Sequence, residues 1–79
     1  MTLDEAIKQV RMTIKTVSAG AEIQTVMISD EEARLSVYAP ASDMQEIKDA
    51  TFQPVLDLLI RGVDIQVFVY DKDNPVAGA

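Results

Sequence analysis

Carboxylates are the most numerous side chains in this sequence that could bind a metal or move a proton, since the chain carries 13 Asp and Glu residues. The segment DKDNPV at 71–76 begins like a calcium-binding loop, with acids or an amide at its first, third and fourth positions. Such a loop needs a glycine at its sixth position and a bidentate glutamate at its twelfth. Val76 occupies the sixth position, so we expect a polar turn here and no metal site.

Catalysis needs an activated group beside an acid or a base, and the chain offers few candidates for one. It contains no His and no Cys, which excludes disulfides and a zinc site built from Cys and His ligands. No serine stands in the G-x-S-x-G pattern of a hydrolase nucleophile. We therefore predict no catalytic residues and no cofactor, in a protein that is not an enzyme.

The charge pattern argues against nucleic acid as a partner. The formal net charge is −6, which opposes general attraction to nucleic acid or to anionic lipid. Lys8, Arg11 and Lys15 share one face of a predicted helix and could meet phosphates. Asp4 lies four residues before Lys8, in the orientation that favours a surface ion pair. We expect this basic stripe to be a solvated helix face.

Acidic residues gather in the segment SDEE at 29–32, where Asp30, Glu31 and Glu32 form a predicted turn. A small acidic protein can imitate the charge of nucleic acid and occupy a basic groove on another protein, and complementary fields speed such an encounter. Ordinary solubility explains the same charge. An acidic inhibitor or nucleic-acid mimic is therefore the alternative function for this chain.

Apolar residues at helical spacing predict a first helix over about residues 3–18. They recur at spacings of three and four from Leu3 to Val17, which places them on one stripe. Thr2 and Glu5 have the spacing of a capping box before this stripe. We expect Gly20 to end the helix in the left-handed conformation.

A second helical stripe starts at Met44 and stops before Gly62. Ser42 and Gln45 have the spacing of a capping box at its start. Pro54 lies inside the stripe, where it removes a hydrogen bond and crowds a carbonyl, so the segment forms either one kinked helix or two short ones. The stripe keeps its phase across the proline, which favours one helix. A further apolar set is expected to pack against the first helix, namely Phe52, Leu56 and Ile60.

Two β-rich runs flank the acidic turn and predict a hairpin. The second run, at 33–40, alternates between apolar and polar residues, as a strand with one buried face does. In the first run, Val26, Met27 and Ile28 are consecutive and apolar. Such a run is typical of a strand covered on both faces, which is what we expect for this strand.

The third predicted strand is the run VDIQVFVYD at 63–71, so the order of elements is α-β-β-α-β. This order predicts an α+β fold: a two-layer α/β sandwich with a three-stranded mixed sheet and both helices on one face. A helical crossover joins strands two and three, which should therefore run parallel. Strand three lies beside either strand two or strand one, and it is an edge strand in both arrangements.

The length of the chain allows one domain, which we place at residues 1–72, followed by a short flexible tail at 73–79. A domain this small buries only about 60% of the surface that its unfolded chain exposes, and oligomerisation is a common way to gain stability. No apolar run is long enough to span a membrane. The N-terminal segment MTLDEAIKQV is unlike a secretory signal. We expect a cytoplasmic protein without membrane contact.

Strand three is the best candidate for a functional surface. Edge strands are usually protected by lysine, proline, a bulge or short length, and the segment 65–70 contains no lysine or proline. Its apolar side chains point to both faces, so pairing with another chain would cover them and satisfy the open backbone. The predicted interface comprises Tyr38, Ile65, Val67, Phe68, Val69 and Tyr70, with Val26 or Met27 beside them.

These observations predict a small, acidic, non-enzymatic module for protein–protein interaction or regulation. We expect a homodimer joined through the third strand, which would merge two three-stranded sheets into one. A further protein partner would bind to the same surface. Salt separates this reading from the acidic inhibitor, because an apolar interface survives added salt and a carboxylate-driven complex weakens.

Overall fold

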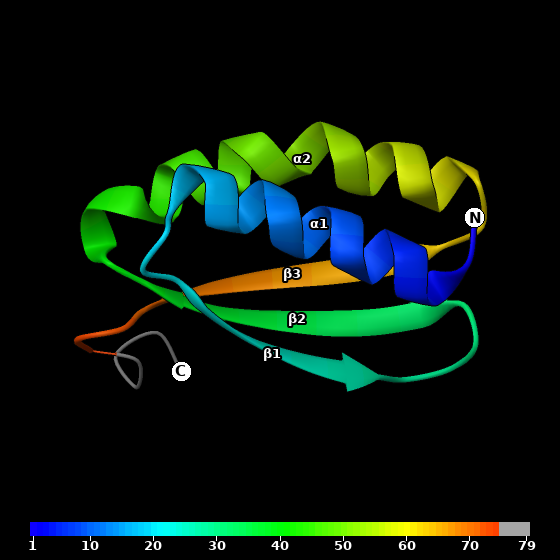
Figure 1. Ribbon diagram of the computed structural model, residues 1–79, viewed down its shortest axis with the longest axis horizontal. Coiled ribbons are helices and arrows are strands. Elements are labelled where there is room, and N and C mark those ends of the chain that lie inside the picture. Colours follow the sequence, from blue (N-terminus) through cyan, green and yellow to red (C-terminus); the bar gives the residue numbers. More distant parts are fainter. Residues whose placement is uncertain (75–79) are drawn as a thin grey trace.

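The computed structural model of the chain describes residues 1–74 and confirms the predicted α+β fold. A three-stranded mixed sheet forms one layer, and two helices on the same face of this sheet form the other (Figure 1). In chain order, the elements are helix α1 (Leu3–Val17), strand β1 (Glu22–Met27), strand β2 (Glu32–Ala39), 3₁₀ helix η1 (Ala41–Asp43), helix α2 (Met44–Ile60) and strand β3 (Asp64–Asp71).

The sheet has the strand order β1-β2-β3. β1 and β2 form the predicted antiparallel hairpin. β2 and β3 run parallel, because α2 carries the chain back along the sheet before β3 begins. Of the two arrangements that the sequence allows, the structure therefore has β3 beside β2. Both β1 and β3 are edge strands.

The core lies between the helices and the inner face of the sheet. β2 supplies the centre of the core, because the predicted alternation holds. Leu35 and Val37 point inward and are fully buried, whereas Arg34 lies on the opposite face of the sheet and is exposed. The helices and the segment that leads into β3 close over these side chains. The main core residues from those elements are Val10, Ile14, Ile47, Leu58, Val63 and Ile65.

The predicted capping box at the start of α1 is present. The Glu5 N–H donates to Oγ1 of Thr2 at 3.2 Å, and the Thr2 N–H and hydroxyl donate to Oε1 of Glu5 at 3.3 Å and 3.0 Å. The hydroxyl hydrogen bond from Thr2, followed by the one from its backbone, lowers the pKa of Glu5 below its usual value. The cap therefore stabilises α1 fully at pH values above the usual pKa of a glutamate. This contribution is lost as the pH falls through the lowered pKa of Glu5.

Two predicted helix ends differ in the structure. Gly20 does not adopt the left-handed conformation, and among residues 1–74 only Gly62 has a positive φ, at 88°. α1 ends instead at Ser18, whose N–H donates to the Ile14 carbonyl at 2.9 Å. The Ser18 hydroxyl also donates to Oδ2 of Asp43 at 2.7 Å, which ties the end of α1 to the start of α2.

The predicted capping box of Ser42 and Gln45 is absent. Ser42 lies within η1, and Asp43 occupies the N-cap position of α2 without a side-chain hydrogen bond to the helix. The carboxylate of Asp43 is already engaged by Ser18. The N-cap side chain of α2 therefore makes a tertiary contact with α1 and no local cap.

The segment after β3 begins with a turn. The Asp73 N–H donates to Oδ1 of Asp71 at 2.9 Å, and the Asn74 N–H donates to the Asp71 carbonyl at 3.1 Å. These two residues open the predicted tail at 73–79. Its remaining part, residues 75–79, lies outside the described residues.

α2 runs without interruption through Pro54, as the constant phase of its apolar stripe predicted. We expect Pro54→Ala to be neutral or to raise the free energy of unfolding by up to about 3 kcal/mol, because alanine restores the missing donor and favours the helix. The control Ala50→Pro, one turn earlier in α2, should lose about 3 kcal/mol or more. Chemical denaturation measures both variants. A clear loss of stability in Pro54→Ala would show that the proline is required to start a second helix.

Candidate functional site

β3 presents half of its backbone groups to the open edge of the sheet. At its two ends, the Asp64 N–H donates to the Glu31 carbonyl at 2.8 Å and the Lys72 N–H donates to the Ala39 carbonyl at 2.9 Å. The backbone groups of successive residues in a strand point to opposite sides, so the even-numbered residues face β2. The groups that face the open edge in the middle of the strand belong to Ile65, Val67 and Val69.

The opposite edge of the sheet, along β1, is covered by helix side chains. Nη1 of Arg11 donates to the Ile23 carbonyl at 3.3 Å and to Oγ1 of Thr25 at 2.9 Å. Nζ of Lys15 donates to the Ala21 carbonyl just before β1. The expectation that the basic stripe is a solvated face is therefore wrong for these two residues, because their long side chains reach across from α1 to the backbone of the edge strand.

No such cover exists on β3 within the part of the chain that the structure describes. The hydrogen bonds of residues 1–74 include none from a side chain to an edge-facing group of Ile65, Val67 or Val69. Lys72, the cation nearest to β3 in sequence, points the other way and donates to the Gly20 carbonyl at 3.3 Å. The two edges of this sheet thus differ in kind: one is shielded by cations and the other is open.

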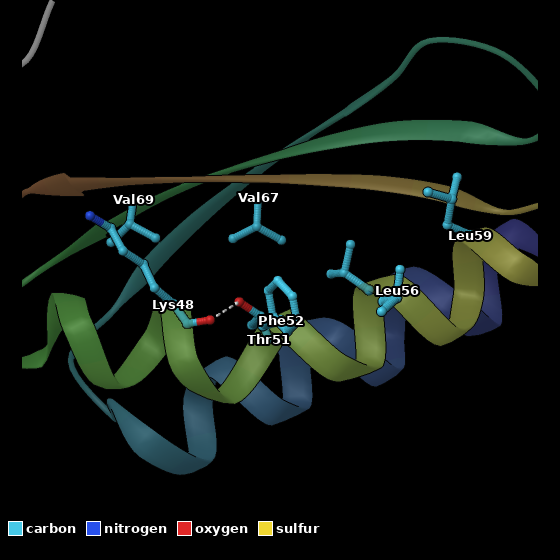
Figure 2. A pocket seen from close by; sticks show the side chains of 8 residues that line it. Lys48, Thr51, Phe52, Leu56, Leu59, Val67 and Val69 are labelled. Atoms are coloured by element: carbon cyan, nitrogen blue, oxygen red, sulfur yellow. Dashed lines mark hydrogen bonds between the residues drawn. The ribbon is translucent and has the colours of Figure 1, made fainter.

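An apolar groove of about 300 Å³ lies beside the open edge, between α2 and β3. Figure 2 shows Phe52, Leu56 and Leu59 of α2 along one wall and Val67 and Val69 of β3 along the other. Lys48 stands at the end of the groove near Val69 (Figure 2). The complete lining is Lys48, Thr51, Phe52, Val55, Leu56, Leu59, Val67 and Val69.

The groove exists because α2 carries two apolar stripes. One stripe, with Ile47, Thr51 and Leu58, is buried in the fold. The prediction that the other stripe packs against α1 is wrong. Its side chains are exposed: Phe52 to 69%, Leu56 to 39% and Ile60 to 78%. α1 already meets the buried stripe, so the second stripe faces solvent beside β3. It comprises Phe52, Leu56 and Ile60.

The remaining predicted interface residues divide between the core and the outer face of the sheet. Ile65 is buried in the core, so only its backbone can reach a partner. Phe68 and Tyr70 lie on the outer face, which no helix covers. The Tyr70 ring stacks on Tyr38 with centroids 5.3 Å apart, and the Arg34 guanidinium lies 5.5 Å from the centre of the Phe68 ring. These contacts hold the outer aromatic side chains in place on the strand.

The prediction that β1 is covered on both faces is also wrong. Val26, Met27 and Ile28 are all exposed. Val26 pairs with Arg34 of β2 and so lies on the uncovered outer face. Ile28 follows the end of the strand. The consecutive apolar residues therefore mark the exposed end of an edge strand rather than a buried strand.

The predicted acidic surface lies at the end of the sheet where β3 begins. Asp30 and Glu31 are exposed, whereas Glu32 is half-buried and its Oε2 accepts a hydrogen bond of 2.5 Å from Nε2 of Gln66. Asp64, the first residue of β3, pairs in register with Glu32. Four carboxylates thus gather at the start of the open edge.

Residues 1–74 hold no group of three or more acidic side chains arranged to bind a metal ion, and no helix within them is long and apolar enough to cross a bilayer.

Neither a protein-family model, nor a curated protein, nor a solved structure matches this chain. A fold of this simple order carries no function by itself. The function must therefore be argued from the open edge of β3 and the groove beside it.

The cover on β1 can be tested by removing its cation. We expect Arg11→Ala to lower the free energy of unfolding by about 1 kcal/mol, because two hydrogen bonds to the edge strand are lost. Lys8→Ala is the matched control, since Lys8 belongs to the same basic stripe but has no hydrogen bond to the sheet, and its effect should stay within about 0.5 kcal/mol. Urea denaturation gives both values. Equal effects of the two substitutions would contradict the assignment of Arg11 to the edge.

Proposed function

We propose that this chain is a small, non-enzymatic, cytoplasmic module for protein–protein interaction or regulation that forms a homodimer through β3. The proposal rests on one observation: the edge of β1 is covered by Arg11 and Lys15, whereas no side chain of residues 1–74 bonds to the edge of β3, which adjoins an apolar groove. Edge strands in stable monomers are commonly blunted or covered. A fold that protects one edge and leaves the other open favours pairing at the open one.

The groove supports strand addition rather than contact between side chains alone. When an extended segment joins a sheet edge, backbone hydrogen bonds supply affinity and alternate side chains enter pockets on one face. At β3, those side chains would lie over Val67 and Val69 and against Phe52 and Leu56 of α2. One partner strand would therefore both satisfy the open backbone and cover Phe52 and Leu56.

The small size of the domain supports a second copy as the partner. A single core of this size gives marginal stability, and an added interface would increase it. The open edge is also self-complementary, because an antiparallel copy of β3 offers the same alternation of donors and acceptors. A two-fold axis would use the same patch on both subunits and would close the assembly.

The acidic cluster is the basis of the alternative function, an inhibitor or nucleic-acid mimic that binds a basic protein surface. Asp30, Glu31, Glu32 and Asp64 lie at one end of the sheet, as such a function requires. Nε2 of Gln66 occupies one carboxylate oxygen of Glu32, which leaves that side chain less free to contact a target. Added salt would dissociate a complex made through these carboxylates, while an apolar strand interface would persist.

A proline substitution tests the homodimer at the backbone. Val67→Pro removes a donor that faces the open edge and leaves the hydrogen bonds between β2 and β3 in place. We expect the unmodified protein to be a dimer by light scattering at micromolar concentration. Val67→Pro should be a monomer with an unchanged helical signal in circular dichroism.

Thr25→Pro is the matched control, because it removes an edge-facing donor from β1 instead. The Ile23 carbonyl that accepts from Arg11 identifies the odd-numbered residues of β1 as edge-facing. This variant should remain a dimer. A monomeric unmodified protein would refute the proposal, as would a Thr25→Pro monomer beside a Val67→Pro dimer.

A further inference from the structure

We infer that the two copies of β3 pair antiparallel with the two-fold axis beside Phe68. This inference rests on the proposed homodimer and specifies its register. The alternation and the charges along β3 indicate which residues approach one another across the axis.

The alternation along β3 restricts the register to a few choices. In a regular antiparallel pair, an edge-facing residue must lie opposite another edge-facing residue. A two-fold axis near the middle of β3 (Asp64–Asp71) can therefore pass beside Val67, which faces the open edge, or beside Phe68, which faces β2. An axis midway between Val67 and Phe68 would place each edge-facing residue opposite one that faces β2, so it would lose the hydrogen bonds.

The register centred on Phe68 uses more of the strand. It places Val67 opposite the partner's Val69, and Ile65 opposite the partner's Asp71, with each pair formed twice. Within β3, the register centred on Val67 pairs only Ile65, Val67 and Val69. It places Asp71 opposite the partner's Val63, which precedes the strand and whose N–H already donates to the Leu58 carbonyl at 2.9 Å. Within β3, the Phe68-centred dimer therefore has four pairs of edge-facing residues and the Val67-centred dimer has three.

Charge favours the same register. With the axis beside Phe68, Asp64 lies opposite the partner's Lys72, and this pair of opposite charges also forms twice. Lys72 is exposed, and in the single chain its Nζ donates to the Gly20 carbonyl at 3.3 Å, so it would exchange that carbonyl for the carboxylate of the partner's Asp64. With the axis beside Val67, Asp64 would instead lie opposite the partner's Tyr70, and Lys72 would face the partner's Gly62. Opposite charges on facing strands stabilise a pair, whereas these other pairings add no such attraction.

The outer face gains an aromatic contact in this register. Phe68 is 43% exposed, and the axis would bring it against the partner's Phe68 in a pair without backbone hydrogen bonds. Side chains approach most closely in such pairs, where the Cα atoms are about 4.5 Å apart. Aromatic pairs across strands contribute to sheet stability. In the other register, Phe68 would face the partner's Gln66.

The inner face is covered by the same arrangement. The partner's Val67 and Val69 would continue the floor of the groove beyond the edge of β3. α2 and its copy would then face each other across the axis, with Phe52, Leu56 and Leu59 between them. All three of these side chains are exposed in the single chain. The second copy thus fits both the backbone edge and the side-chain groove.

Single cysteines test this register, and the absence of native cysteine makes the readout clean. Phe68→Cys should form a disulfide-linked dimer under mild oxidation, seen on a non-reducing gel, because a Cα separation of about 4.5 Å permits the bond. In Val67→Cys, the two cysteines would lie diagonally at about 7–8 Å. That separation exceeds the limit of about 7 Å for a disulfide, so this variant should cross-link several-fold more slowly.

Gln24→Cys controls for random collisions. Gln24 is exposed on the outer face of β1, in the same row as Ser36 and Phe68 but at the opposite edge. It should cross-link no faster than Val67→Cys. Equal cross-linking of Gln24→Cys and Phe68→Cys would overturn the register.

The remaining outcomes separate this inference from the function on which it rests. Rapid cross-linking of Val67→Cys in place of Phe68→Cys would overturn the Phe68 register and keep the homodimer. A dimer by light scattering in which neither variant cross-links would also overturn the register. If the protein is a monomer, the proposed homodimer itself fails.

Discussion

The parallel pairing of β3 with β2 is the constraint on which the rest of this structure depends. The chain reaches β3 only through α2, and the crossover lays α2 along the strand that it leads into. Within residues 1–74, β3 is the last strand, and no described element follows to cover its other side. The same connection therefore creates both parts of the candidate site: the open backbone edge and the apolar wall of α2 beside it.

The two edges of the sheet show how such a small domain distributes its protective groups. α1 lies near β1, and its cations at Arg11 and Lys15 reach the backbone there. α2 offers β3 apolar side chains instead, with Lys48 at one end of the groove. Cations that bond to an edge strand discourage pairing, whereas an apolar wall beside an open edge favours it. The difference in side-chain chemistry between the helices thus assigns different roles to the two edges.

Much of the fold could be predicted from the sequence, because many of its features depend on residues that are close together along the chain. The alternation at Leu35 and Val37, the capping box of Thr2 and Glu5, and the constant phase across Pro54 each involve neighbours in sequence. The edge character of β3 followed from topology alone. These features needed no knowledge of which side chains meet across the fold.

Most of the errors involve contacts between distant segments. Periodicity shows that α2 has two apolar stripes, but it does not say which one α1 meets, so Phe52 and Leu56 were assigned to the wrong side. The bond from Ser18 to Asp43 joins residues far apart in sequence, and it engages the N-cap residue of α2, one position after the cap expected at Ser42. The reach of Arg11 to Ile23 is likewise a contact through space. The groove was missed for the same reason, although the unexplained second stripe of α2 was the signal that pointed to it.

The central claim is that the edge-facing backbone groups of β3 are paired in solution. Hydrogen exchange measured by NMR at high and low protein concentration tests it at single amides. The account predicts that the Val67 and Val69 amides exchange slowly at high concentration, like the Phe68 amide that bonds to β2, and become fast on dilution. Fast exchange of both amides at every concentration, beside a slow Phe68 amide, would show that the edge stays open and would contradict the account.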